Sequence, residues 1–301
     1  MTVDGLGGSV IDVDGEQLRV AVDHPKAEGP AAIFADGLGI SYDYWDPVID
    51  LLQNVTAVRF DRPGLGGSPT SNQSSRDLRH EVERLLAVAD EVVPDRDLLL
   101  VGHSYGGLIA EATARWYPER TVGLVLVDAI DPTEYAKANW TPPPLRARAL
   151  GLLFQNNRFA TYGGPLIEKV GTLFNTTRKT GPRLSDEQRR LISTPRHLRT
   201  ILKEDVRLPR HCSQGLELEE QTAMPDIPVQ VLVGASRGRP FASLETRWIE
   251  RSRRRLPQFG PRVNFLLVRS AHLMMFDSPH AVADAISRAL KGLPPPQKAA
   301  K

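Results

Sequence analysis

The chain has 301 residues, of which 41% are hydrophobic and 25% charged, a composition typical of a globular protein with a large core. Its formal net charge of +2 gives no reason to expect nucleic-acid binding, and no stretch approaches the roughly 20 apolar residues that span a bilayer. Cys212 is the one cysteine, which excludes an intramolecular disulfide and a cysteine metal cluster. Because the first residues lack the pattern of a signal peptide, we expect a cytoplasmic protein.

Short apolar runs alternate with helical patterns along most of the chain. The first two runs flank Asp14-Gly15, a dipeptide typical of a tight hairpin turn. Further predicted strands cover 31–36, 55–61, 97–102, 122–128, 228–234 and 263–268, and predicted helices cover about 44–53, 75–92, 105–117, 242–255 and 279–291. Apolar strands alternating with helices predict an α/β fold with a doubly wound, mostly parallel, eight-stranded sheet.

The alternation stops between about 132 and 225, where no strand-like run occurs and Ser185–Gln188 has the form of a helix capping box. We predict a helical cap inserted there over the carboxyl ends of the strands, within a single domain spanning 1–291 and followed by a flexible tail, 292–301. Residues 132–224 contain 15 Lys and Arg and 9 Asp and Glu, a net charge of +6. Such an excess suits anionic substrates, although it is more often a solvated helix face.

The segment Gly102-His103-Ser104-Tyr105-Gly106 lies directly between a predicted strand and a predicted helix. A serine hydroxyl becomes a useful nucleophile only where it is exposed and has a base nearby. A tight strand-to-helix turn exposes the hydroxyl but crowds the backbone, and glycines two residues before and after the serine relieve that crowding. The pattern therefore indicates Ser104 as a nucleophile.

The segment 102–107, GHSYGG, is similar to the nucleophile elbow of the α/β-hydrolase family. Residues 36–39, Asp-Gly-Leu-Gly, resemble the family's His-Gly-x motif, with Asp36 in place of the histidine, and residues 60–68 resemble its turn after the fourth strand. The resemblance implies an oxyanion hole built from the backbone N–H groups of Leu38 and Tyr105.

His272 follows the last predicted strand, in the position where the family keeps its catalytic histidine. A histidine on a loop at the carboxyl edge of the sheet can reach Ser104 and accept its proton near neutral pH. We therefore expect His272 to be the base.

The catalytic acid is harder to assign. Many relatives carry it after the seventh strand in a Gly-x-x-Asp pattern, but Arg237 stands at that position here, three residues after Gly234. Arginine accepts no hydrogen bond and repels an imidazolium. Part of the family places the acid after the sixth strand instead, which makes Asp128 the leading candidate and Asp131 the alternative, with another residue or no acid at all still open.

The resemblance implies a cofactor-independent, metal-free hydrolase that cleaves a carboxylic ester, or a related acyl bond, through an acyl-enzyme. The expected substrate is a small acyl compound with an apolar part, held under the apolar cap residues around 149–154. Acyl transfer and cofactor-free haloperoxidase-like activity use the same residues. A non-hydrolytic ligand receptor on the same fold is the alternative from another class, and Arg237 is the feature that favours it.

Overall fold

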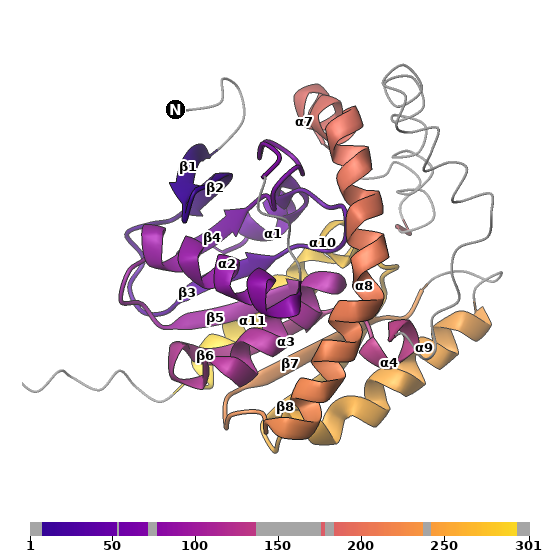
Figure 1. Ribbon diagram of the computed structural model, residues 1–301. Coiled ribbons are helices and arrows are strands. Elements are labelled where there is room, and N and C mark those ends of the chain that lie inside the picture. Colours follow the sequence, from indigo (N-terminus) through magenta and orange to yellow (C-terminus); the bar gives the residue numbers. More distant parts are fainter. Residues whose placement is uncertain are drawn as a thin grey trace, which may run out of the picture.

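The computed structural model describes residues 8–52, 54–71, 77–136, 176–177, 184–236 and 242–293. Within these ranges eight strands form one sheet in the order β1-β2-β4-β3-β5-β6-β7-β8 (Figure 1). The strands are β1 (Ser9–Val13), β2 (Glu16–Asp23), β3 (Ala31–Ala35), β4 (Ala57–Phe60), β5 (Leu98–His103), β6 (Thr121–Val127), β7 (Val229–Gly234) and β8 (Val263–Val268). β1 and β2 pair antiparallel, β2 runs antiparallel to β4, and every later pair is parallel. The predicted mostly parallel α/β sheet is confirmed.

The order of the strands reverses at β3, with β4 on one side and β5 on the other. The loops that leave the carboxyl ends of β3 and β5 therefore diverge, and open α/β sheets bind ligands at such a point. Residues 36–39 follow β3, and Ser104 follows β5. The two segments that the sequence analysis singled out thus lie at the same edge of the sheet.

Helices cover both faces of the sheet. α2 (Leu78–Val92) and α3 (Tyr105–Trp116) pack on one face, and α1 (Asp46–Ile49), α10 (Met274–Asp277) and α11 (Pro279–Lys291) pack on the other. In β5, Leu98 and Leu100 belong to the first core and Leu99 and Val101 to the second, and all four are fully buried. Burial on both faces explains why the strand reads as a continuous apolar run.

One predicted helix is divided in the structure. A 3₁₀ turn, η1 (Tyr42–Trp45), and the short α1 replace the single helix expected over 44–53. Pro47 lies in the first turn of α1, and because proline has no N–H to donate to the preceding turn, a new helix starts there.

The cap lies between β6 and β7 and includes α4 (Pro132–Tyr135), α7 (Asp186–Ile192) and the long α8 (Pro195–Gln221). The predicted capping box is present, with Ser185 and Gln188 exchanging two hydrogen bonds. α8 crosses in front of the sheet in Figure 1, and its carboxyl half packs on α2 and α3. The apolar segment around 149–154 and Arg237 lie outside the described residues.

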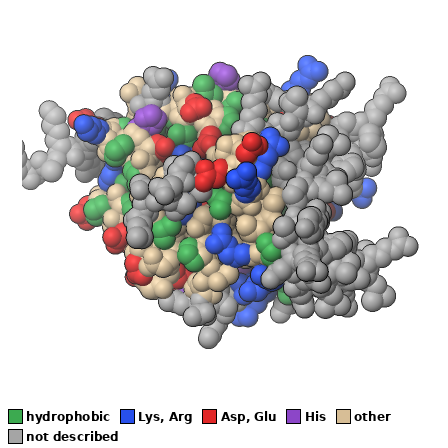
Figure 2. Space-filling view, turned by 90° about the horizontal axis from the view of Figure 1, so that it is seen from above, with side chains coloured by type: hydrophobic (Ala, Val, Ile, Leu, Met, Phe, Trp, Pro, Cys, Tyr) green, Lys and Arg blue, Asp and Glu red, His purple; other side chains and the backbone are tan. Residues whose placement is uncertain are grey.

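The described part of the face in Figure 2 mixes acidic, basic and apolar side chains rather than presenting a field of one sign. α9 (Ala242–Arg255) precedes β8 and completes the helices around the sheet. None of the described helices combines the length and the apolar character needed to cross a membrane.

Candidate active site

Ser104 stands at the turn between β5 and α3, with φ 53° and ψ −120°, a strained conformation for a residue that carries a side chain. A Cβ added at Gly102 would lie 2.4 Å from the carbonyl oxygen of Gly106, and one added at Gly106 would lie 2.0 Å from that of Ala35. Both positions therefore require glycine, for the reason that the sequence pattern indicates. The turn presents Ser104 at the carboxyl edge of the sheet.

A chain of hydrogen bonds connects Ser104, His272 and Asp128. Oγ of Ser104 lies 3.0 Å from Nε2 of His272, and Nδ1 of the same ring lies 2.6 Å from Oδ2 of Asp128. The Asp128 side chain is fully buried, whereas the His272 side chain is 22% exposed. The three residues singled out in the sequence thus meet in the order serine, imidazole, carboxylate.

The second oxygen of Asp128 is held independently of the histidine. Oδ1 accepts hydrogen bonds from the backbone N–H of Gly234 and from Nε1–H of Trp248, each at 3.0 Å. Asp131 instead caps α4, where its Oδ1 accepts from the backbone N–H and the hydroxyl of Thr133. The geometry favours Asp128 over Asp131 as the partner of His272.

The loop 36–39 lies against the start of α3, since a Cβ at Gly106 would also come within 2.7 Å of the Asp36 carbonyl oxygen. The N–H of Tyr105 is the first of α3, so it has no acceptor within the helix. Neither this N–H nor that of Leu38 donates to the backbone of another described residue. Both proposed oxyanion donors therefore belong to adjoining segments and keep their hydrogen-bonding capacity.

The loop 36–39 is fixed by hydrogen bonds from Arg62 and to the cap helix α8. Arg62 donates to the carbonyl oxygens of Asp36 and Gly37 at 2.7 and 2.8 Å, and its guanidinium forms an ion pair with Glu204 of α8 at 2.7 Å. Glu204 also accepts from the N–H of Gly39 at 2.9 Å. Two buried charges of opposite sign thus fix the loop that carries Leu38.

His197 of α8 completes this support. Its Nδ1 accepts from the N–H of Gly66 at 3.0 Å, and its Nε2 donates to the carbonyl oxygen of Gly39 at 2.9 Å. Burial lowers the pKa of His197 to about 4, so the ring is neutral near pH 7 and keeps one donor and one acceptor.

Asp36, which replaces the histidine of the family motif, is almost completely buried and accepts from Nε1–H of Trp45 at 2.6 Å. Its Oδ2 has no hydrogen-bond partner among the described residues. Burial raises the pKa of this carboxyl well above its usual range, although Arg62 opposes the shift. The side chain packs behind the loop.

Residues 33–285 match a family model described as the alpha/beta hydrolase family. The chain belongs to the alpha/beta hydrolase family. A solved alpha/beta hydrolase illustrates the shared fold: the enol-lactonase from Burkholderia xenovorans LB400 superposes with a TM-score of 0.66 at 16% identity, covering 94% of this chain and 100% of the lactonase.

Two curated relatives match over shorter segments. A poly(3-hydroxyalkanoate) depolymerase of Ectopseudomonas oleovorans is 30% identical over 119 residues, which are 38% of this chain and 41% of the depolymerase. A proline iminopeptidase of Saccharolobus solfataricus is 31% identical over 101 residues, 33% of each protein. The chain thus matches less than half the length of these relatives. Because their names imply different substrates, membership of the alpha/beta hydrolase family does not by itself select one.

Several residues at this site of the alpha/beta hydrolase were not singled out as functional in the sequence. Trp248, Glu204 and His197 come from α9 and α8, far along the chain from the groups they contact. His103 is fully buried beneath the elbow, and its Nε2 lies 3.0 Å from the carbonyl oxygen of His272. A signal existed only for His103, through its position beside Ser104.

Proposed function

We propose that the protein is a serine hydrolase that cleaves carboxylic esters through an acyl-enzyme. The observation that carries the proposal is the hydrogen-bond chain from Ser104 through His272 to Asp128. Each member has the chemistry for its role, since an alcohol becomes nucleophilic only when a neighbouring base removes its proton.

In the acylation step, Oγ of Ser104 attacks the ester carbonyl carbon while its proton passes to Nε2 of His272. The carbonyl oxygen becomes an oxyanion that accepts from the N–H groups of Leu38 and Tyr105, each donor being worth about 10²–10³ in rate. His272 then gives the proton to the departing alcohol. Water repeats the sequence on the acyl-enzyme, and Ser104 recovers its proton as the carboxylic acid leaves.

Asp128 orients the base. Its Oδ2 accepts from Nδ1–H of His272, which keeps the lone pair of Nε2 directed at Ser104 and stabilises the imidazolium formed during attack. The bonds from Gly234 and Trp248 to Oδ1 hold the carboxylate in this orientation. Because Asp128 supplies a carboxylate in this proposal, Arg237 at the position of the family's usual acid is no longer a reason to favour a non-hydrolytic receptor.

Two similarities support an ester as the bond cleaved. The enol-lactonase shares the fold, and a lactone is a cyclic ester; the depolymerase shares sequence over 119 residues, and its polymer is a polyester. An ester also makes a smaller demand on the general acid than an amide does, because an alkoxide leaves more readily than the anion of an amine, whose nitrogen must be protonated before it departs. A small acyl substrate with an apolar part remains the expected partner.

The test is labelling by a fluorophosphonate probe, measured as a second-order rate constant for the native protein, Ser104→Ala and His272→Ala. We expect rapid labelling that is lost in the first variant and slowed by orders of magnitude in the second. Ser252→Ala is the matched control, because this hydroxyl donates to the carbonyl oxygen of Trp248 within its own helix.

A panel of p-nitrophenyl esters of increasing acyl length, a lactone and a p-nitroanilide then tests the bond. Turnover of esters at least tenfold above the anilide supports the proposal. Absence of labelling in a folded protein would refute the hydrolase, and preference for the anilide would refute the ester.

A further inference from the structure

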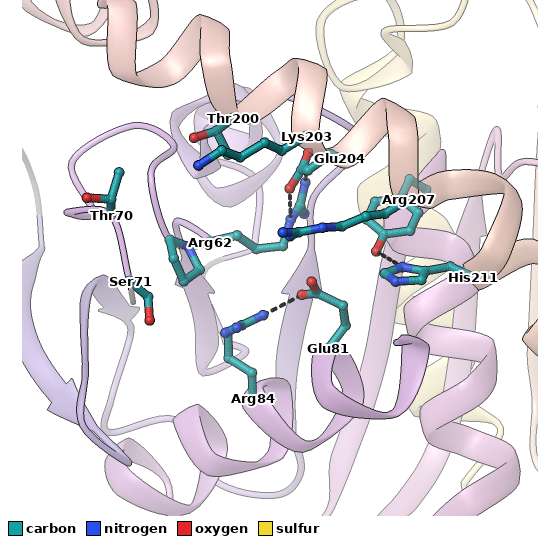
Figure 3. A pocket seen from close by; sticks show the side chains of 12 residues that line it. Arg62, Thr70, Ser71, Glu81, Arg84, Thr200, Lys203, Glu204, Arg207 and His211 are labelled. Carbon is teal, nitrogen blue, oxygen red and sulfur yellow. Dashed lines mark hydrogen bonds and ion pairs between the residues drawn. The ribbon is translucent and has the colours of Figure 1, made fainter. Parts of the chain in front are cut away.

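A cavity lies between α8 and α2, and neither Ser104 nor His272 lines it (Figure 3). The space available there to the centres of water-sized groups is about 70 Å³. One water needs roughly 10–15 Å³ by this measure, so the cavity admits a group of a few heavy atoms but not an extended acyl chain. It is therefore not the acyl pocket of the proposed ester hydrolase.

Two of the arginines that line the cavity are already neutralised. Arg62 is paired with Glu204, and Arg84 is paired with Glu81 and Glu16. All five of these side chains are at least nine-tenths buried. The two arginines and three glutamates leave one net negative charge, so the walls provide a polar frame without a net positive charge of their own.

Two further cations of α8 add to this frame. Lys203 and Arg207 reach over the cavity from the helix, opposite Glu81 and Arg84 (Figure 3). Neither forms an ion pair with a residue in the part of the chain that the structure describes. The cavity thus faces two positive charges that no described carboxylate neutralises.

A buried donor also points to a ligand. Nδ1 of His211 lies 2.6 Å from the Tyr105 hydroxyl, and the His211 side chain is 1% exposed. Burial lowers the pKa of His211 to about 4, so the ring is neutral near pH 7. If the Tyr105 hydroxyl donates to Nδ1, the ring proton is on Nε2, which lacks a partner among the described residues; if Nδ1–H donates instead, the Tyr105 O–H is the donor left over. Buried donors in native proteins nearly always have an acceptor.

We infer that this cavity binds a phosphate group, free or as a small phosphomonoester. Lys203 and Arg207, which pair with no described carboxylate, attract a phosphate dianion, and its oxygens accept from the guanidinium of Arg207, the ammonium of Lys203 and the remaining donor of the Tyr105–His211 pair. The site is separate from the nucleophile. It adjoins the machinery proposed for ester cleavage, because Arg62 and Tyr105 line the cavity and also belong to the oxyanion region.

The experiment is calorimetric titration with inorganic phosphate and, separately, methyl phosphate, in a phosphate-free buffer at constant ionic strength. We expect one saturable site with a dissociation constant at or below about 1 mM. Arg207→Ala and Lys203→Ala should each weaken binding about tenfold or more, as expected for the loss of a charge-assisted hydrogen bond. Arg210→Ala is the matched control, since this exposed arginine lies on the same helix but does not line the cavity.

Tighter binding of methyl phosphate would identify a phosphomonoester as the ligand, and tighter binding of inorganic phosphate would identify the free ion. Ser104→Ala should bind phosphate like the native protein, so this result is independent of whether the protein hydrolyses esters. Absence of saturable binding would overturn the inference. Equal weakening of phosphate binding in Arg207→Ala and Arg210→Ala would overturn it too, because it would show diffuse attraction to a basic helix. Since Lys203 is exposed, Lys203→Ala is the variant least liable to unfold and keeps the test valid if Arg207→Ala does not fold.

Discussion

Replacement of Asp128 by asparagine should abolish most of the activity while leaving the fold intact. The two donors at Oδ1, the N–H of Gly234 and Nε1–H of Trp248, require an oxygen at that place. The asparagine oxygen will therefore occupy it, and the NH₂ group will face Nδ1 of His272. An NH₂ group only donates, so Nδ1 must become the acceptor and the ring proton must move to Nε2.

With its proton on Nε2, His272 donates toward Ser104 and has no lone pair there to accept the serine proton. A locked tautomer of this kind lowers turnover by about 10⁴ in a serine protease, which corresponds to about 5.5 kcal/mol of transition-state stabilisation. We expect a loss of the same order in the rate constant for fluorophosphonate labelling and in ester turnover.

Asp131→Asn is the control for this variant, because asparagine also caps helices well and Asp131 contacts Thr133 of α4. It should label within about a factor of two of the native rate, because no step proposed here passes through it. Urea unfolding should give nearly native stability for Asp128→Asn, since the Gly234 and Trp248 bonds are kept. A labelling rate within tenfold of native for Asp128→Asn would refute the reasoning.

Three other predictions concern groups around the catalytic chain. Trp248→Phe removes one of the two donors to Oδ1 of Asp128. It should lower the rate constant for fluorophosphonate labelling about tenfold relative to that of the native protein, measured in parallel. Glu204→Gln leaves the buried Arg62 without a counter-charge and should lower the free energy of unfolding in urea by about 3–5 kcal/mol. Burial raises the pKa of Asp36, so its contribution to stability is full below about pH 4 and falls as pH rises. Asp36→Asn has no carboxyl to titrate, so its free energy of unfolding should rise relative to that of the native protein by up to about 1.4 kcal/mol per pH unit above pH 4. Urea unfolding of both proteins at a series of pH values measures this difference. A difference that stays constant with pH would contradict the burial argument.

The fold was predictable where burial on two faces dictates the residue types. β5 lies in the middle of the sheet, and its apolar run ends in the glycine that the elbow needs, so strand, turn and helix follow from local sequence. α8 was less predictable, because Pro209 interrupts its helical pattern. It persists as a 27-residue helix since its carboxyl half packs on the body, where a Cβ at Gly215 would lie 2.6 Å from a Leu108 methyl group.

Ser104 and His272 were predictable because each stands in a local motif at the end of a strand. For the acid, the family resemblance made Asp128 the leading candidate, but local sequence did not separate it from Asp131, because both follow β6 and lie only three residues apart. What separates them is the pair of contacts that Asp128 makes with Trp248 and His272, 120 and 144 residues further along the chain. Local sequence carries no information about bonds between such distant groups, which depend on how α9 packs against β7.

The geometry of the neighbouring strand supports Asp128, which follows β6, as the proposed acid. β6 and β7 are adjacent and parallel, with Val127 opposite Leu232, so their carboxyl ends lie side by side. Gly234, which begins the family's usual acid motif after β7, here donates its N–H to the carboxylate at Asp128. A Cβ at Gly234 would lie 2.8 Å from the carbonyl oxygen of Ser270, in the loop that carries the histidine. The glycine thus lets this loop approach the sheet closely, and its N–H holds the carboxylate of Asp128 at the end of the adjacent strand β6.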